Sequence, residues 1–296
     1  MTRRDELTAT RSDRGRSFLK SAVRRWSWAV TALIGLLAIG VGIGHAQQIF
    51  SGYYGSTPPK FATATTFKGA FNFCRAMFSS NRREKRGWDT DYPGADINFS
   101  IRLSELTKTR VSKESEGGDP DHVVVRLTDN ALFQCPFLLM EDAGTAIFNE
   151  QEVVRLREYL LKGGFLFVSD YWGPLAKEQF DAEIGRALPR SQYPIVAIPM
   201  DHPMWHTQFE VTRVPQMPSI QSWRRSGGTF ERGVGTGTQD ARGIADGHGR
   251  LMVVMLHNTD VPDGWEREGE DREYFLKFSP DAYSVGIDIA LYGMTH

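Results

Sequence analysis

The stretch Asn149–Trp172, NEQEVVRLREYLLKGGFLFVSDYW, predicts a helix, a glycine break and a buried strand in direct succession. Asn149 can cap the helix, with Glu152 reaching back from three residues later. Gly163 follows the last helical turn and can take the left-handed conformation that ends a helix. The uninterrupted apolar run Phe165–Val168 is typical of a strand covered on both faces in a parallel sheet. This stretch therefore indicates an α/β fold.

Other segments repeat this alternation of strands and helices. We expect strands at 61–67, 122–127 and 251–256, and helices at 96–106, 174–188 and 281–292, with 69–77 as a helix or turn. Alternating strands and helices indicate a mostly parallel central sheet between helical layers, which is a three-layer sandwich. The segment 224–249 contains eight glycines and no apolar period, so we expect a glycine-rich insertion outside the core, either a flexible loop or a hairpin or flap.

The N-terminus has the pattern of an export signal. Eight Lys/Arg and three Asp/Glu precede Ala46, and the 18 residues Trp26–Ile43 carry no charge. We predict a signal peptide or membrane anchor at 1–46, a linker at 47–60 and one α/β domain at 61–296. The domain would lie outside the cytoplasm, in the periplasm or tethered to the inner membrane if the segment stays uncleaved.

Charge and cysteine content narrow the class of protein further. Removal of residues 1–46 changes the net charge from −1 to about −6, which excludes a basic nucleic-acid footprint. Cys74 and Cys135 each lie among apolar neighbours, so we expect buried free thiols, with a disulfide as the alternative.

The exported part carries none of the short catalytic motifs. GxSxG and GxCxG elbows, HExxH and CxxC metal pairs, and GxxxxGK[ST] and GxGxxG phosphate loops are all absent from its sequence. We therefore expect no cofactor and lean against an enzyme.

Polar residues at the ends of predicted strands are the remaining candidates for function. The carboxyl ends of parallel strands share one edge of a sheet, where carboxylates can act as a base or bind a hard cation and a histidine can shuttle protons. The alternative is that these residues only cap helices and form turns. The ligand-binding candidates are Asp129, Asp170, Tyr171, His257 and Asp260, and Asn130, Glu141 and Asp142 lie at similar positions.

His202 and His206 are weaker metal candidates. They are four residues apart, but Pro203 between them disfavours one regular helix that would place both on one face. We favour a structural His-Pro turn.

Several motifs in order along the chain resemble the bacterial domain of unknown function 4159. They are Tyr92-Pro93 with Asp96, DNALFQCPFLLM (129–140), YLLKGGFLFVSD (159–170), His202-Pro203, and HNTD (257–260) followed by Gly264-Trp265-Glu266. The resemblance implies a glutamine-amidotransferase-like, flavodoxin-like fold. Two departures bear on activity: neither cysteine stands in a glycine-flanked elbow, and Asp170-Tyr171 stands where many members carry two acids.

We therefore expect a non-catalytic domain that binds a small molecule, a carbohydrate or a cell-envelope protein at its strand ends. Asp170, Tyr171 and His257 are the preferred residues. The first alternative is a hydrolase acting on a carbohydrate or envelope component, with Asp170 as base and His257 or His202 helping through a bound metal. The second is a structural subunit of an envelope assembly.

Overall fold

The computed structural model describes residues 57–81 and 87–296, and Thr57–His296 forms one compact unit. The predicted signal peptide or anchor at 1–46 and most of the predicted linker lie outside the described residues. Within the described part, no helix is both long enough and apolar enough to cross a membrane.

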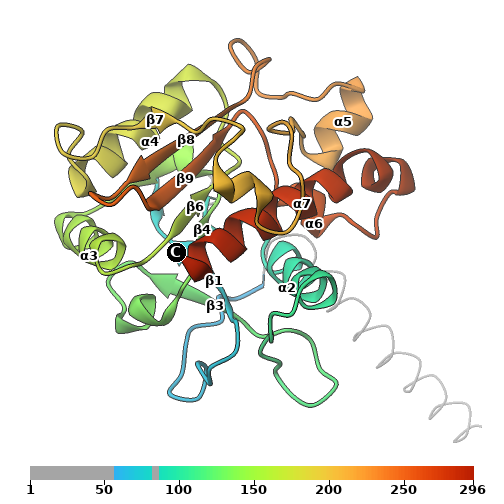
Figure 1. Ribbon diagram of the computed structural model, residues 1–296. Coiled ribbons are helices and arrows are strands. Elements are labelled where there is room, and N and C mark those ends of the chain that lie inside the picture. Colours follow the sequence, from blue (N-terminus) through green and yellow to red (C-terminus); the bar gives the residue numbers. More distant parts are fainter. Residues whose placement is uncertain (1–56, 82–86) are drawn as a thin grey trace, which may run out of the picture. The chain divides into compact units, whose positions relative to one another are not determined.

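The centre of the unit is a mixed sheet, seen in Figure 1, in which most strands run parallel. In order across the sheet, its seven strands are β3 (His122–Arg126), β1 (Phe73–Met77), β4 (Leu138–Met140), β6 (Leu166–Val168), β9 (Leu251–His257), β8 (Asp240–Ala245) and β7 (Val196–Ala197). The first five are parallel, whereas β8 runs antiparallel to β9 and β7 antiparallel to β8. A separate antiparallel pair is formed by β2 (Ser79–Ser80) and β5 (Ala146–Ile147).

Helices cover both faces of this sheet (Figure 1). The α-helices are α2 (Gly94–Leu106), α3 (Glu150–Leu161), α4 (Gly173–Ala187), α5 (Ile220–Ser226), α6 (Asp263–Glu266) and α7 (Arg272–Thr295), and the 3₁₀ helices are η1 (Asn130–Gln134), η2 (Ala143–Thr145) and η3 (Pro203–His206). Successive strand residues point to opposite faces, so Phe73 packs in one core with α2, α6 and α7, while Cys74 packs in the other with α3 and α4. The predicted α/β sandwich is confirmed.

The decisive stretch folds as predicted. The Asn149 side chain accepts the Glu152 N–H at 2.9 Å, and the Glu152 carboxylate accepts the Asn149 N–H at 2.8 Å, which completes the capping box. Gly163 has a φ of +102° and ends the helix. Strand β6 then lies between β4 and β9 with all its residues buried.

The predictions for the first part of the domain were wrong. Residues 61–67 form a turn with one isolated bridge, Phe61 to Val124, and the strand is β1, inside the segment that we expected to be a helix or turn. The threonines at 63, 65 and 66 bond to one another, so local side-chain hydrogen bonds replace strand pairing there.

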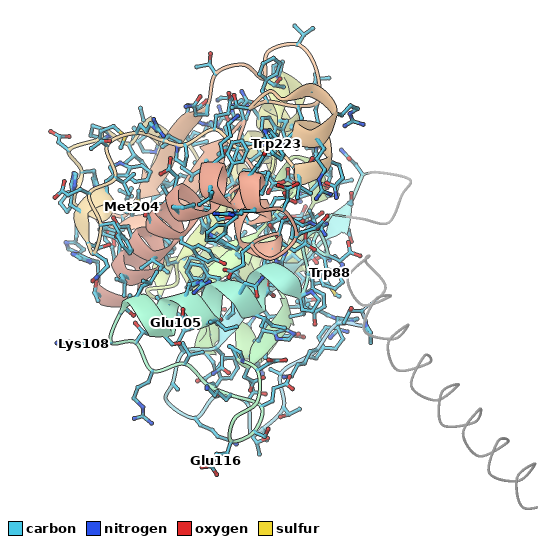
Figure 2. All side chains as sticks on the ribbon, turned by 90° about the vertical axis from the view of Figure 1, so that its right-hand side faces the viewer. Trp88, Glu105, Lys108, Glu116, Met204 and Trp223 are labelled. Carbon is cyan, nitrogen blue, oxygen red and sulfur yellow. A yellow bond between two sulfur atoms is a disulfide. The ribbon has the colours of Figure 1, made fainter. Side chains whose placement is uncertain are left out.

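The prediction of an insertion outside the core was wrong for 240–245, whereas 227–239 form a loop without helix or strand. The segment 224–249 contains strand β8, which pairs with β9 over six residues. Position 243 of that strand requires a glycine, because a Cβ there would come within 2.8 Å of Leu251. The last helix is longer than expected and begins at Arg272, where Asp271 caps it by accepting two backbone N–H groups. Trp223 of α5 packs on this helix, with its ring 5.7 Å from that of Tyr274 (Figure 2).

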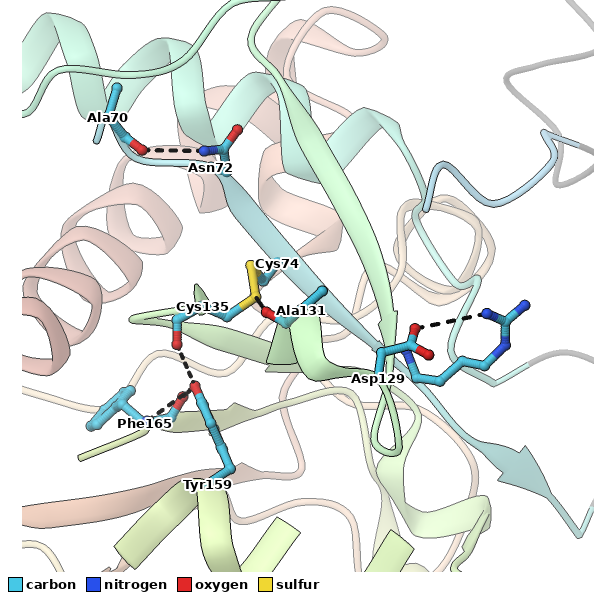
Figure 3. Close-up of a disulfide and its surroundings, with 9 residues drawn as sticks. Ala70, Asn72, Cys74, Asp129, Ala131, Cys135, Tyr159 and Phe165 are labelled. Carbon is cyan, nitrogen blue, oxygen red and sulfur yellow. Dashed lines mark hydrogen bonds and ion pairs between the residues drawn. A yellow bond between two sulfur atoms is a disulfide. The ribbon is translucent and has the colours of Figure 1, made fainter. Parts of the chain in front are cut away.

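The two cysteines are not free thiols. Cys74 of β1 and Cys135, just before β4, form a disulfide with their Cα atoms 6.0 Å apart (Figure 3). Their apolar surroundings fit either state, and sequence alone does not reveal that the strand pairing of β1 with β4 brings them together. The bridge joins residues 61 positions apart in the chain.

Candidate functional site

The backbone turns sharply where three neighbouring parallel strands end. Asp142 follows β4, Asp170 follows β6 and Asn258 follows β9, and each has a positive φ, between 47° and 58°. Asp and Asn tolerate this left-handed conformation better than other non-glycine residues. In the described part of the chain, the other non-glycine residues with positive φ are Asp91 and Arg232, which lie at the same place, as the contacts below show. Strained backbone gathered at one point is a common mark of a functional site.

Carboxylates gather at this edge of the sheet. We call the set Asp91, Glu141, Asp170, Glu231, Asp260, Asp263 and Glu266 the carboxylate cluster. Asp91, Glu141 and Asp260 each place an oxygen within 4.8 Å of the other two, and so do Asp170, Glu231 and Asp260. A third group consists of Asp91, Asp263 and Glu266, and its oxygens also lie within 4.8 Å of one another.

Buried arginines hold several of these acids in place. Arg75 of β1 is fully buried, and its guanidinium group bonds to Asp96 and Glu141 and donates to the carbonyl of Trp88 at 3.2 Å and of Thr90 at 2.7 Å. Trp88 is labelled in Figure 2. Glu141 directly follows β4, and Asp96 lies in helix α2. Arg75 therefore ties the end of β4 to α2.

Two further arginines bind the other parts of the cluster. Arg232 bonds to Asp142 at 2.9 Å and to both oxygens of Asp170 at 3.3 Å. Arg267 pairs with Glu266 at 2.5 Å and lies 3.7 Å from Asp263. Asp263 also accepts the Ile220 N–H at 2.7 Å and the Tyr274 hydroxyl at 2.8 Å, so its carboxylate is well satisfied.

Burial and mutual repulsion hold protons on the cluster. Burial raises the pKa of Glu141 to about 8 even though Arg75 opposes the change, and raises that of Asp170 to about 7 against the opposing effect of Arg232. Burial is the largest cause, and the charge of Asp260 the second largest, of a pKa of Asp91 that is raised well above its usual range. The pKa of Asp260 is also raised well above its usual range, first by burial and second by the charge of Asp170. A bound cation would relieve both effects.

Buried carboxylate oxygens of the cluster lack hydrogen-bonding partners among the described residues. One oxygen of Glu141 bonds to Arg75, but Oε1 has no hydrogen-bonding partner among the described residues, although the side chain is fully buried. Asp91 Oδ2 and Glu266 Oε2 are buried in the same way, but the Asp91 and Glu266 carboxyl groups interact with each other and Glu266 pairs with Arg267. Buried polar atoms are nearly always satisfied, so Glu141 Oε1 is available to accept a bond from a ligand.

The predicted residues Tyr171 and His257 belong to a neighbouring polar network. The Tyr171 hydroxyl accepts a hydrogen bond from Arg242 at 3.0 Å. His257 lies 2.9 Å from Asp240 through Nδ1 and 3.0 Å from the Gly173 carbonyl through Nε2, so both ring nitrogens are engaged. This network fixes the end of β9 against helix α4 and leaves His257 no nitrogen with which to bind a metal.

Of the five ligand-binding candidates, the structure brings Asp170 and Asp260 together in the cluster and leaves Asp129 outside it. Asp129 accepts the Arg126 N–H at 3.0 Å in the turn after the edge strand β3, and its carboxylate lies 3.7 Å from the Arg126 guanidinium group (Figure 3). His202 accepts the Met204 N–H at 3.1 Å, as a capping residue does, while His206 contacts Glu210 and the Met200 carbonyl. The two histidines share no metal group with any described carboxylate.

Sequence reasoning missed much of the cluster. Glu266 lies in the Gly264-Trp265-Glu266 motif of the family resemblance, and Asp91 directly precedes Tyr92-Pro93, but neither was considered as a ligand. Glu231 and Arg232 were hidden in the segment that we had set aside as an insertion. No local pattern marks them, because their role depends on a long-range fold.

A comparison with protein-family models places this chain in a known family. The family model described as a domain of unknown function (DUF4159) matches residues 78–294, which include every member of the carboxylate cluster. Arg75 lies just before the matched region. A search of curated proteins gave no match to this chain.

Proposed function

We propose that this chain, which belongs to the DUF4159 family, is an exported domain that binds a hard divalent cation at the carboxylate cluster. The observation that carries the proposal is the group Asp91, Glu141 and Asp260, whose oxygens lie within 4.8 Å of one another. Oxygens on opposite sides of a cation with bonds of about 2.4 Å lie about this far apart, as in Ca²⁺ sites. The unpartnered Oε1 of Glu141 supplies a free ligand atom.

The ligand chemistry favours Ca²⁺, Mg²⁺ or Mn²⁺ over Zn²⁺. The set is entirely oxygen, with no cysteine and no histidine among its members, and hard cations prefer such ligands. Cation binding at this sheet edge is compatible with the wider hypothesis that the domain binds a small molecule, a carbohydrate or an envelope protein there.

Two features support export. The basic N-terminus and the apolar stretch Trp26–Ile43 have the order of an export signal. Cys74 and Cys135 form a disulfide, and disulfides persist mainly in oxidising compartments such as the periplasm.

The glutamine-amidotransferase-like assignment within the α/β class is also part of this proposal, and the parallel strands between two helical layers support it.

A metal-assisted hydrolase is the second candidate, because Asp170 has a pKa raised to about 7. A carboxylate with a pKa near neutrality can take and release a proton at the working pH. In this hypothesis Asp170 is the base and the cation lies at the neighbouring group Asp91, Glu141 and Asp260. His257 does not act through the metal, because both its nitrogens are engaged.

Thermal unfolding of the full-length chain in mild detergent tests cation binding. After treatment with chelator, Ca²⁺ or Mn²⁺ at about 100 times Kd should raise Tm by about 5–10 °C. Asp260→Asn should abolish the increase, because the amide removes the charge yet keeps the oxygen that accepts the Asp263 N–H.

Asp129→Asn is the matched control, since it removes a strand-end carboxylate that lies outside the cluster. Its Tm should rise with the cation as in the wild type. Equal increases in wild type and Asp260→Asn, or no increase in any of the three proteins, would contradict the proposal.

A further inference from the structure

Asp260 belongs to two of the groups that could hold a cation. It shares one with Asp91 and Glu141 and the other with Asp170 and Glu231, and within each group the oxygens lie within 4.8 Å of one another. Asp260 therefore lies between two adjacent positions. A carboxylate has two oxygens and can bind a different cation with each.

The two positions are built alike. Each has one carboxylate oriented by an arginine: Arg75 bonds to Glu141 at the first position, and Arg232 bonds to Asp170 at the second. Ligand carboxylates in metal sites are commonly held by such partners. An arginine behind each ligand also favours its charged form, which is the form that binds a cation.

Glu231 is fixed at the second position by helix α5. Its Oε2 accepts the Ser219 hydroxyl at 2.9 Å and the Ser222 hydroxyl at 2.7 Å, and its Oε1 lies 3.4 Å from the Ser219 nitrogen. These bonds hold the side chain where its carboxylate meets those of Asp170 and Asp260. The residue is therefore placed before any ligand arrives.

The third group has no need of a cation. Arg267 already pairs with Glu266 and lies beside Asp263, and Asp263 accepts two further hydrogen bonds. The Arg267 guanidinium group thus lies beside two of the three carboxylates, whereas Arg75 and Arg232 each contact only one carboxylate of their own group.

The charge of the site favours more than one ion. The three guanidinium groups of Arg75, Arg232 and Arg267 face nine carboxylates, which are the seven of the cluster together with Asp96 and Asp142. When these acids ionise, one divalent cation compensates only part of that excess, and a second cation can take the place of protons that burial and repulsion otherwise hold there.

We propose that the cluster binds two divalent cations that share Asp260. The first is held by Asp91 and Glu141, and the second by Asp170 and Glu231. This inference rests on the proposed function, since it adds a second ion to the same cluster. Two-cation sites in proteins have the ions about 3.5–4 Å apart, a separation that a bridging carboxylate sets. The second ion also joins the segment that carries Glu231 to the ends of β6 and β9.

Mn²⁺ binding to the full-length chain in mild detergent tests the pair. Equilibrium dialysis should give about two Mn²⁺ per chain, and electron paramagnetic resonance should show the spin-coupled signal of two ions that share a ligand. Glu231→Gln should retain about one Mn²⁺ and lose the coupled signal, because the amide keeps an oxygen for the Ser219 and Ser222 bonds but removes the charge. Asp129→Asn should behave as the wild type.

The outcomes separate this inference from the proposed function. One Mn²⁺ in both wild type and Glu231→Gln would overturn the pair and leave the single site standing. No Mn²⁺ in the wild type would overturn both. Loss of both ions in Glu231→Gln, with an unchanged circular dichroism spectrum, would show that the two positions are not separate and would also overturn the pair.

Discussion

Arg75 is the residue on which the strand-end carboxylates depend most. Its side chain is fully buried, and burial alone would lower its pKa, but Asp96 and Glu141 outweigh that effect and raise the pKa above its ordinary value. Arg75→Met should therefore lower the free energy of unfolding by about 3–5 kcal/mol, because removal of one partner leaves buried carboxylates unpaired. Denaturant unfolding of the full-length chain measures this loss.

Arg126→Met is the control for that change. Arg126 ends the neighbouring strand β3, is exposed, and lies 3.7 Å from Asp129, so its loss should cost less than about 1 kcal/mol. Similar losses for the two variants would mean that the buried network around Arg75 does not contribute as argued.

Single residues were predictable from sequence only where the signal was local. Asn149 and Gly163 could be assigned because capping and helix termination depend on a few neighbouring residues. Asp170 and Asp260 could be named because they follow buried strands. Arg75, Asp91 and Glu231 could not, since their roles come from partners that are distant in sequence, and the arginine lies in a strand that we expected to be a helix or turn.

At the scale of elements, helix α7 packs closely on α6 and α2 through Gly286. A Cβ on this residue would lie 2.2 Å from Trp265 Cζ2 and 3.0 Å from Phe99 Cε2. Gly286→Ala should lower the free energy of unfolding by about 1–3 kcal/mol, because overpacking a tight core forces helices apart. The loss is expected even though alanine favours a helix over glycine by up to about 1 kcal/mol.

Gly247→Ala provides the comparison, since a Cβ on that residue has no neighbour within 4 Å. Its effect should stay within about 0.5 kcal/mol. If denaturant unfolding shows Gly286→Ala to be as stable as the wild type, α7 is free to shift, and its packing does not fix the position of α6 and of the acids that α6 carries.

The elements that sequence could predict are those with a strong apolar period or an uninterrupted apolar run. Helix α3 and strands β6 and β9 belong to this class. Strand β8 was missed because DARGIA contains charged and small residues, and its place in the sheet depends on pairing with β9 and on the close approach at Gly243. Short helices such as α6 have too few residues to show a period.

At the scale of the whole molecule, the buried acids link stability to pH. Burial raises the pKa of Glu141 to about 8, of Asp170 to about 7, of Glu266 to about 7 and of Asp263 to about 6, while Arg75, Arg232 and Arg267 oppose the increase. Between about pH 4 and pH 8 the folded state therefore holds more protons than the unfolded state. Without cations, stability should fall as pH rises through this window, by about 1.4 kcal/mol per pH unit for each extra proton held.

Divalent cations should reverse that trend, because they neutralise the acids that repel one another and compete with protons for the same oxygens. Thermal unfolding of the full-length chain in chelator should give a lower Tm at pH 8 than at pH 5, and saturating Ca²⁺ should raise Tm more at pH 8 than at pH 5. Glu141→Gln removes one of the titrating groups, so its Tm in chelator should depend less on pH than that of the wild type. A wild-type Tm in chelator that is constant or rises from pH 5 to pH 8 would mean that the cluster ionises without cost and has no electrostatic need for a cation.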